Sequence, residues 1–430
     1  MSPVFSSCPE HPLRLTKRLC AIAGLVAIAG LSGCVTPPEA AKPVVPVAPV
    51  ANLPPAPPST HPMIAEEPGF LRLGNIPSGT NPVRVGVLLP FSNGSGQTRV
   101  LAASMMKAAQ LALFDSGNSN IILISADEGS TPETAAAGAR GLLAQGAEII
   151  VGPLFSASVA AVAPIAHDRA VPVISFSTDK TVAGNGVYLL SFQPENEIHR
   201  IISYAHAQGH NNFAALVPES AYGNHITDAM KDAVAASGGT VSDVERISAT
   251  DQETALHAVA ASNADAVLIA QGGAQLRELA PMLAAQGVDR GKMKLLGSGL
   301  WDDPANSKES MLEGGWFAAP APNAGDTFNT KYKGTFGTTP PQLATLAYDA
   351  VSLAALLASG EPYHRFTANA LTDANGFAGI DGIFRFNADG TSERGLAILS
   401  VEPDGFRVID PASRTFEKPA EEKPPTKPQT

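Results

Sequence analysis

Residues 147–166 read AEIIVGPLFSASVAAVAPIA and contain the transition that decides the fold. A short β-branched run ends at Val151, and the Gly152-Pro153 pair breaks it. Such a run predicts a buried strand, and the alanine-rich segment that begins near Ser156 predicts a helix. Serine is a frequent cap at a helix start. This stretch therefore predicts a strand, a tight turn and a helix N-terminus.

The turn before this helix has two interpretations. Backbone N–H groups at a helix N-terminus have no partner in the helix, and they attract anionic or hydrogen-bond-accepting groups. The serines at positions 156 and 158 would satisfy these donors as ordinary caps, or the turn would form one wall of a ligand site. The stretch by itself favours the cap.

Strands and helices alternate on both sides of this stretch. Residues 121–127 predict a strand, and Thr131 and Pro132 predict the start of the following helix. Further on, strands are expected at 213–218 and 265–270, with a helix near 221–237 between them. Short apolar runs that alternate with helices predict an α/β fold, with helices on both faces of a parallel sheet. About 330 residues from 83 to 410 favour two such lobes over one.

The N-terminus has the features of an export signal. Arg14, Lys17 and Arg18 precede an apolar run that ends in Leu31-Ser32-Gly33-Cys34. This tetrapeptide resembles the bacterial lipobox, which implies that residues 1–33 are a lipoprotein signal peptide and that Cys34 is acylated. The alternative is an ordinary signal peptide in which the cysteine occurs by chance.

The segments that flank the expected folded part are rich in proline. Residues 34–82 contain repeated Pro, Ala and Val, which predicts a semi-stiff, extended tether, and residues 411–430 predict a disordered tail. The three cysteines lie at positions 8, 20 and 34, so a disulfide, a cysteine nucleophile and a cysteine-rich metal site are excluded from the rest of the chain. The net charge of −11 argues against a nucleic-acid partner.

Several motifs resemble one family, in family order. These are RVGVLLPFSNG (84–94), EIIVGPLFSASVAAVAPIA (148–166), VPVISFST (171–178), FAALVPESAYGNHITDAMKDAV (213–234), PPQLATLAYDAVSLAALLA (340–358) and GFAGIDGIFRFNADGTSERGLAI (376–398). They look like the type I periplasmic binding proteins of the leucine-binding branch. The resemblance implies two Rossmann-like parallel-sheet lobes, joined by three crossovers, with a ligand between them. It places the first lobe at about 83–190 and 323–360, and the second at about 191–322 and 361–410.

The resemblance also implies a set of ligand contacts. The first-lobe contacts would be Ser156, Ser175, Ser177 and Thr178, and the second-lobe contacts would be Tyr222, Trp301 and Asp302. The alternative role of the serines is capping, and that of Tyr222 is packing at a helix start. The loop PFSNGSGQ (90–97) and Gln271 depart from the amino-acid-binding members, which carry an aromatic or polar anchor in the first loop and often an aromatic at the second position.

These departures, the lipid anchor and the long tether resemble the lipoprotein activators of penicillin-binding proteins. That branch implies regulation of a peptidoglycan synthase from the outer membrane, and Val35 after Cys34 is compatible with outer-membrane sorting. The alternative is a receptor of an ABC transporter for amino acids or small peptides.

Enzyme motifs are weak in this sequence. Ser104–Lys107 and Ser177–Lys180 match S-x-x-K, but neither is accompanied by S-D-N or K-T-G. His199, His206 and His210 are more readily explained as solvent-facing residues than as metal ligands. We therefore expect a binding protein rather than an enzyme, with no cofactor and no metal.

Overall fold

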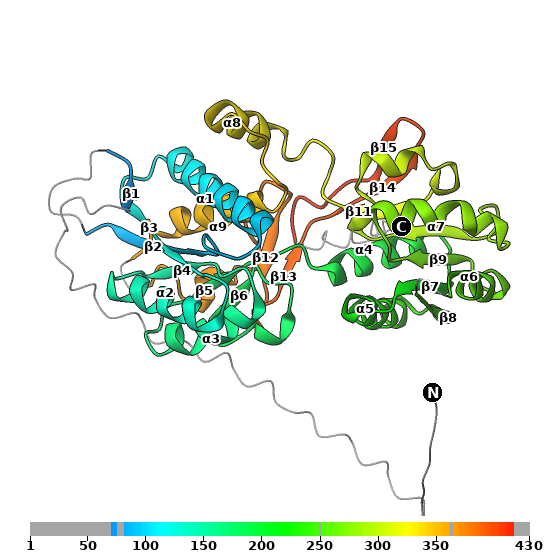
Figure 1. Ribbon diagram of the computed structural model, residues 1–430, viewed down its shortest axis with the longest axis horizontal. Coiled ribbons are helices and arrows are strands. Elements are labelled where there is room, and N and C mark those ends of the chain that lie inside the picture. Colours follow the sequence, from blue (N-terminus) through cyan, green and yellow to red (C-terminus); the bar gives the residue numbers. More distant parts are fainter. Residues whose placement is uncertain (1–69, 75–80, 249–250, 362–363, 417–430) are drawn as a thin grey trace, which may run out of the picture. The chain divides into compact units, whose positions relative to one another are not determined.

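The computed structural model describes residues 70–74, 81–248, 251–361 and 364–416. Within them the chain forms two parallel-sheet lobes, as the strand and helix alternation predicts (Figure 1). The signal peptide, Cys34 and most of the tether and tail lie outside the described residues.

The first lobe is built on a six-stranded sheet with the strand order β1-β3-β2-β4-β5-β6. All neighbours are parallel except β1 and β3. The apolar strand β2 has all seven residues buried, because helices cover both faces of the sheet. The strands are β1 (Phe70–Arg72), β2 (Val83–Leu89), β3 (Ile121–Asp127), β4 (Ile149–Val151), β5 (Val173–Ser175) and β6 (Val187–Leu189).

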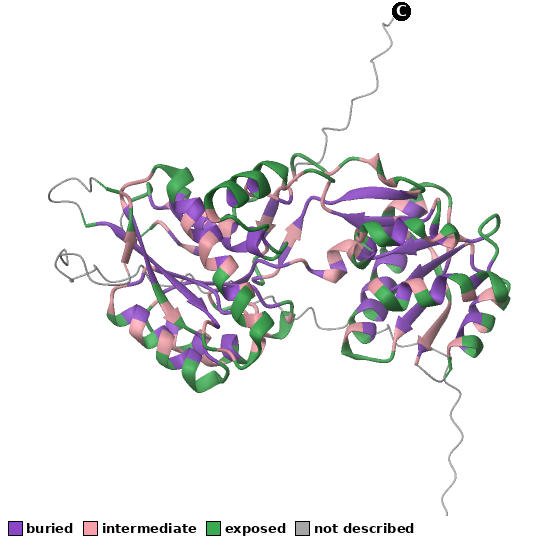
Figure 2. Ribbon diagram, turned by 45° about the horizontal axis from the view of Figure 1, so that its top comes forward, coloured by how far each residue is buried: buried purple, intermediate pink, exposed green. Residues whose placement is uncertain are grey.

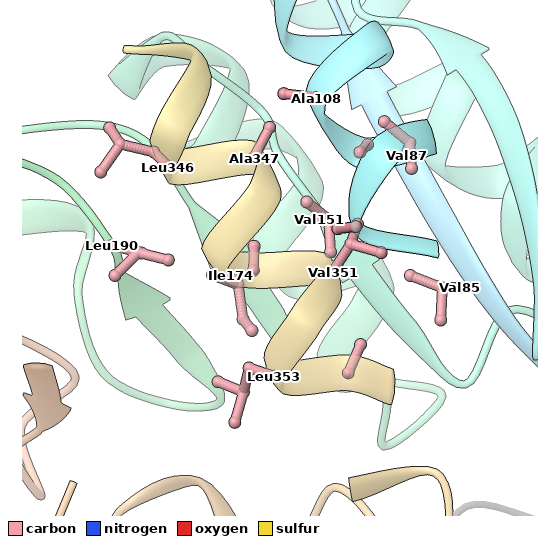
Figure 3. Packing of buried hydrophobic residues seen from close by; sticks show 14 of the residues in the cluster. Val85, Val87, Ala108, Val151, Ile174, Leu190, Leu346, Ala347, Val351 and Leu353 are labelled. Carbon is pink, nitrogen blue, oxygen red and sulfur yellow. The ribbon is translucent and has the colours of Figure 1, made fainter. Parts of the chain in front are cut away.

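Alternate residues of the first sheet supply two apolar cores. Helices α1 (Gly96–Ser116) and α9 (Ala344–Leu357) pack on one face, and α2 (Pro132–Ala144) and α3 (Ser156–His167) pack on the other. Figure 3 shows Val351 of α9 next to Val151 of the sheet, in the same apolar cluster as Val85 and Val87. Helix α2 begins as predicted, with Thr131 as its N-cap and Pro132 in its first turn.

The second lobe is built on a seven-stranded sheet with the order β15-β14-β11-β10-β9-β7-β8. Its core strands are parallel, and β14 and β15 add in antiparallel fashion at one edge. Figure 2 shows buried strands between helices whose outer sides are exposed. The strands are β7 (Asn212–Pro218), β8 (Thr240–Ile247), β9 (Ala266–Ile269), β10 (Lys294–Gly297), β11 (Trp316–Ala319), β14 (Ala397–Glu402) and β15 (Gly405–Asp410).

Helices again cover both faces of the second sheet. One core contains residues of α4 (Pro194–Ala207) and α5 (Ala221–Ser237), and the other contains residues of α6 (Gln252–Ala261) and α7 (Gly273–Ala285). The remaining elements are η1 (Lys180–Val182), η2 (Gly299–Trp301), η3 (Pro304–Lys308), η4 (Ser310–Leu312), α8 (Asp326–Phe336), α10 (Ala368–Leu371) and the hairpin strands β12 (Phe384–Phe386) and β13 (Ser392–Arg394).

Three boundaries differ from the sequence expectation. Phe70–Arg72 were assigned to the tether, but their backbone pairs with β3 as an edge strand. The segment from Phe366 to Phe386 was assigned to the second lobe, but its apolar side chains belong to the core of α1 and α9, and Phe386 contacts the ring of Tyr188. Phe416 was assigned to the tail, but its ring lies under the guanidinium of Arg385. In each case apolar or backbone groups gain partners that are distant in the sequence.

Candidate functional site

The turn between β4 and α3 is formed as the sequence predicts. Gly152 has a φ of +101°, which L side chains rarely adopt, and a Cβ at this position would lie 1.9 Å from the carbonyl oxygen of Leu88. Only glycine therefore lets the chain pass so close to β2 and begin α3 directly afterwards.

The donors at the start of α3 are already occupied by a side chain of the protein. The Glu128 carboxylate accepts hydrogen bonds from the backbone N–H groups of Leu154 (2.8 Å) and Phe155 (3.0 Å). Glu128 is fully buried, and burial raises the pKa of its carboxyl despite these bonds and one from Ser158. The N-cap residue, Phe155, makes no side-chain cap bond. The Glu128 carboxylate thus binds the N–H groups at the start of α3. An anionic ligand at these groups was one of the two interpretations of the turn.

The predicted first-lobe contacts are largely bonded to one another and to the backbone. The Ser175 hydroxyl donates to the carbonyl of Pro153 at 3.0 Å, and the Ser177 hydroxyl accepts from the backbone N–H of Asp179 at 3.1 Å. Ser156 is partly exposed and hydrogen-bonds the Asp179 carboxylate, whose pKa is lowered mainly by hydrogen bonds from Thr181 and to a smaller extent by the one from Ser156. Thr178 is exposed. Of the four residues, Ser156 and Thr178 are thus the more accessible to a ligand.

Tyr222 lies at the start of α5, where Gly223 permits close packing. A Cβ on Gly223 would lie 1.9 Å from the carbonyl oxygen of Pro218. The Tyr222 hydroxyl lies 3.2 Å from the hydroxyl of Ser298, which follows β10. Burial raises the pKa of Tyr222 to about 12, so the phenol stays protonated and can donate a hydrogen bond at neutral pH.

Two carboxylates complete this group of side chains. Glu197, from the first turn of α4, accepts a hydrogen bond from the backbone N–H of Gly299 at 2.8 Å. Burial, followed by the charges of Glu195 and Asp302, raises the pKa of Glu197 to about 7. Asp302 is exposed on one side, and partial desolvation followed by the charges of Asp381 and Asp303 raises its pKa. We refer to Glu197, Tyr222, Ser298 and Asp302 as the second-lobe polar cluster.

Trp301, which was predicted as a ligand contact, does not belong to this cluster. Its side chain is fully buried in the core of α6 and α7, and its Nε1–H donates to the carbonyl of Ile269 at 3.1 Å. Gly297 and Gly315 make room for the ring, since a Cβ on either would lie within 2.8 Å of it. The neighbouring Leu300 is 47% exposed instead.

Sequence reasoning missed Glu128, Glu197 and Ser298. One signal was available for Glu128, because it directly follows the buried strand β3, and polar residues after parallel strands gather at one sheet edge. The position of Glu197 four residues after Gln193 indicates only a favourable helix start. Its contact with Gly299 joins residues 102 positions apart.

Among the residues that the structure describes, no helix is both long and apolar enough to cross a membrane. No group of three or more His, Cys, Asp or Glu side chains in the same residues is arranged to hold a metal ion.

A curated protein with a matching sequence is an uncharacterized protein of Rickettsia prowazekii, 24% identical over 163 residues. The match covers 38% of this chain and 43% of that relative, so this chain spans less than half the length of the relative.

Solved structures match at low identity and show the fold. They include a putative branched-chain amino acid ABC transporter protein from Rhodospirillum rubrum (20% identical, TM-score 0.67, 76% of this chain and 100% of that chain). Another is the substrate-binding protein LivJ from Streptococcus pneumoniae in complex with isoleucine (19% identical, TM-score 0.53, 77% of this chain and 100% of that chain). A third is a solute-binding protein from R. palustris in complex with benzoate (20% identical, TM-score 0.53, 77% of this chain and 98% of that chain).

The model of one protein family matches residues 82–406, which is most of the chain and both lobes. Its description is periplasmic binding protein, in agreement with the sequence motifs, the two sheets and the solved structures. The chain therefore belongs to the periplasmic binding protein family.

Proposed function

We propose that this protein is a periplasmic solute-binding protein whose second-lobe polar cluster takes the amino group of a small solute, such as an amino acid or a short peptide. The observation that carries the proposal is a pair of carboxylates, Glu197 and Asp302, that have no Lys or Arg within ion-pair distance among the described residues. An ammonium group would offset part of their combined negative charge, and burial makes such pairing favourable. The Tyr222 hydroxyl and Ser298 supply hydrogen bonds beside them.

The surroundings of the cluster also support a small ligand. Leu300 lies between Ser298 and Asp302 after the end of β10, and its side chain is 47% exposed. In open α/β sheets ligands bind outside the carboxyl ends of the strands, and most ligand sites combine apolar surface with a few polar groups. Similar structures carry isoleucine or benzoate, so the fold accommodates ligands of this size.

We expect the affinity for an amine to rise with pH. Glu197 has a pKa of about 7 in the free protein, and a bound ammonium group favours its ionised form. Binding therefore releases a proton below pH 7, and the affinity should increase about tenfold between pH 6 and pH 8. Glu197→Gln keeps an acceptor for the Gly299 N–H but removes the charge, so the affinity should fall and its pH dependence should disappear. Isothermal titration calorimetry of the purified protein against the twenty amino acids measures both effects.

Glu219→Gln is the matched control, because Glu219 is an exposed residue of the same lobe and its substitution removes the same charge. It should leave the affinity and its pH profile unchanged. Each amino acid that binds should also be compared with its carboxamide. The donors of α3 are taken by Glu128, so the carboxamide should bind within about threefold of the amino acid. A pH profile that persists in Glu197→Gln would contradict the assignment of Glu197.

A second function is favoured by the occupied N–H donors at the start of α3, which are bonded to Glu128. We infer that, if the cleft lacks the carboxylate half of an amino-acid clamp, the protein acts through a partner, as a regulator of a peptidoglycan synthase. In this case no amino acid should bind tighter than about 10 μM, which is roughly −7 kcal/mol. The immobilised protein should instead retain a purified synthase. Sub-micromolar amino-acid binding without synthase retention would exclude the regulator.

The anchor belongs to the same proposal. Lipidation of Cys34 would hold the protein at the periplasmic face of a membrane, which we propose to be the outer membrane, with residues 35–69 as the tether. Several acyl chains give stable attachment, whereas one chain binds marginally.

A further inference from the structure

The second-lobe polar cluster carries more negative charge than one ammonium group can balance. Glu197 and Asp302 have no Lys or Arg within ion-pair distance among the described residues. Burial raises the pKa of Glu197 to about 7, and the charge of Asp302 adds to this shift, so the two carboxylates lie within electrostatic reach of each other. A single ammonium group would leave one of these two charges unbalanced.

Glu195 adds a third carboxylate beside this pair. Its side chain is only 10% exposed, and the ammonium group of Lys180 lies 3.3 Å from its Oε1. The other oxygen, Oε2, makes no hydrogen bond with any described residue. After burial as the main cause, the charge of Glu195 contributes to the raised pKa of both Glu197 and Tyr222, so it acts on the same site. Since Lys180 balances one charge, the three carboxylates together retain an excess of two negative charges when they are ionised.

The surroundings of the cluster offer no free cation to a carboxylate on the ligand. Arg277 donates to the Asp303 carboxylate at 3.0 Å, and Lys180 pairs with Glu195. The N–H donors at the start of α3 are bonded to Glu128. A carboxylate placed beside the polar cluster would therefore be repelled without compensation. These charges favour a ligand with two amino groups and no carboxylate.

The accessible groups of the cluster suit an organic dication rather than a metal ion. The acidic side chains do not converge as metal ligands, since no group of three or more is so arranged among the described residues. Leu300, next to Asp302, is 47% exposed and offers apolar surface to methylene groups. Glu197 is half-buried, and its Oε2 accepts from the Gly299 N–H, whereas its Oε1 makes no hydrogen bond with a described residue. Asp302 is exposed, so the two carboxylates provide one sheltered and one more open position for ammonium groups.

We propose that the ligand of this cluster is an aliphatic diamine, with one ammonium group on Glu197 and the other on Asp302. This assignment rests on the proposed function, because it uses the same site, and it narrows the solute from an amine to an organic dication. Aliphatic amines keep their protons at neutral pH, as the lysine side chain does, so both ends of a diamine are charged. Such a ligand balances both carboxylates and brings no negative charge of its own.

Calorimetry of the full-length purified protein with 1,4-diaminobutane and n-butylamine at neutral pH tests this assignment. The two amines have the same chain length and differ in one ammonium group. The diamine should bind about thirtyfold more tightly, because a second carboxylate balances its second charge. Asp302→Asn should reduce this ratio to about threefold or less, since only Glu197 then remains to pair with an ammonium group. Asp228→Asn is the matched control, because Asp228 is an exposed residue of the same lobe, and this variant should keep the ratio.

The outcomes separate the diamine assignment from the proposed function. Equal affinities of the wild-type protein for the two amines, or a ratio that persists in Asp302→Asn, would overturn the assignment and leave the amine site in place. Competition by Mg²⁺ at the concentration of the diamine would also overturn it, because the site would then accept any dication. If neither amine bound, the assignment would fail and the amino-acid titrations would decide the proposed function alone. An unchanged diamine affinity in Glu197→Gln would overturn both.

Discussion

Glu128→Ala should lower the free energy of unfolding by about 2–4 kcal/mol. The substitution leaves the partly buried N–H groups of Leu154 and Phe155 without their acceptor, and each lost bond costs about 1–3 kcal/mol where water does not replace it. Removal of a carboxyl whose pKa is raised by burial offsets part of this loss. Urea denaturation of the wild-type protein and the variant measures the difference.

Formate should restore part of the stability lost in Glu128→Ala. The variant has a small cavity with two N–H donors at a helix N-terminus, which is suited to a carboxylate. The exposed residue Glu219 provides the control, since Glu219→Ala should be within about 0.5 kcal/mol of the wild type and should not respond specifically to formate. If Glu128→Ala were as stable as the wild type, the α3 turn would not depend on this internal carboxylate.

Trp301→Ala should be destabilising by about 3–5 kcal/mol, because it removes a fully buried aromatic side chain from the second-lobe core. The carbonyl of Ile269 also loses its side-chain donor. Thermal and urea unfolding followed by far-UV circular dichroism measure this effect. Ligand affinity should change little where the variant is folded, since the ring has no exposed surface.

Trp316 is the natural comparison because it is the second tryptophan of the chain and is only partly buried. Its ring packs against Tyr204 and Lys294 at the surface of the sheet. Trp316→Ala should therefore cost less than Trp301→Ala. A loss of ligand affinity in Trp301→Ala without a loss of stability would return Trp301 to the ligand site.

The sequence by itself determined the fold and its local turns. Apolar runs such as Val83–Leu89 and Ile121–Asp127 have the bounds of β2 and β3, and Thr131 and Pro132 start α2 as expected. Gly152 marks the turn before α3, where no other residue fits. These features depend on neighbours within a few positions along the chain, so their patterns can be read directly.

The tertiary structure decided which polar groups remain available to a ligand. Glu128 reaches the start of α3 from 26 residues away, and Glu197 meets Gly299 from 102 residues away. Trp301 lies in the core although its neighbours Leu300 and Asp302 are exposed, because Gly297 and Gly315 leave space for its ring. Hydrogen bonding and burial depend on which distant segments pack together, and a local pattern carries no information about that choice.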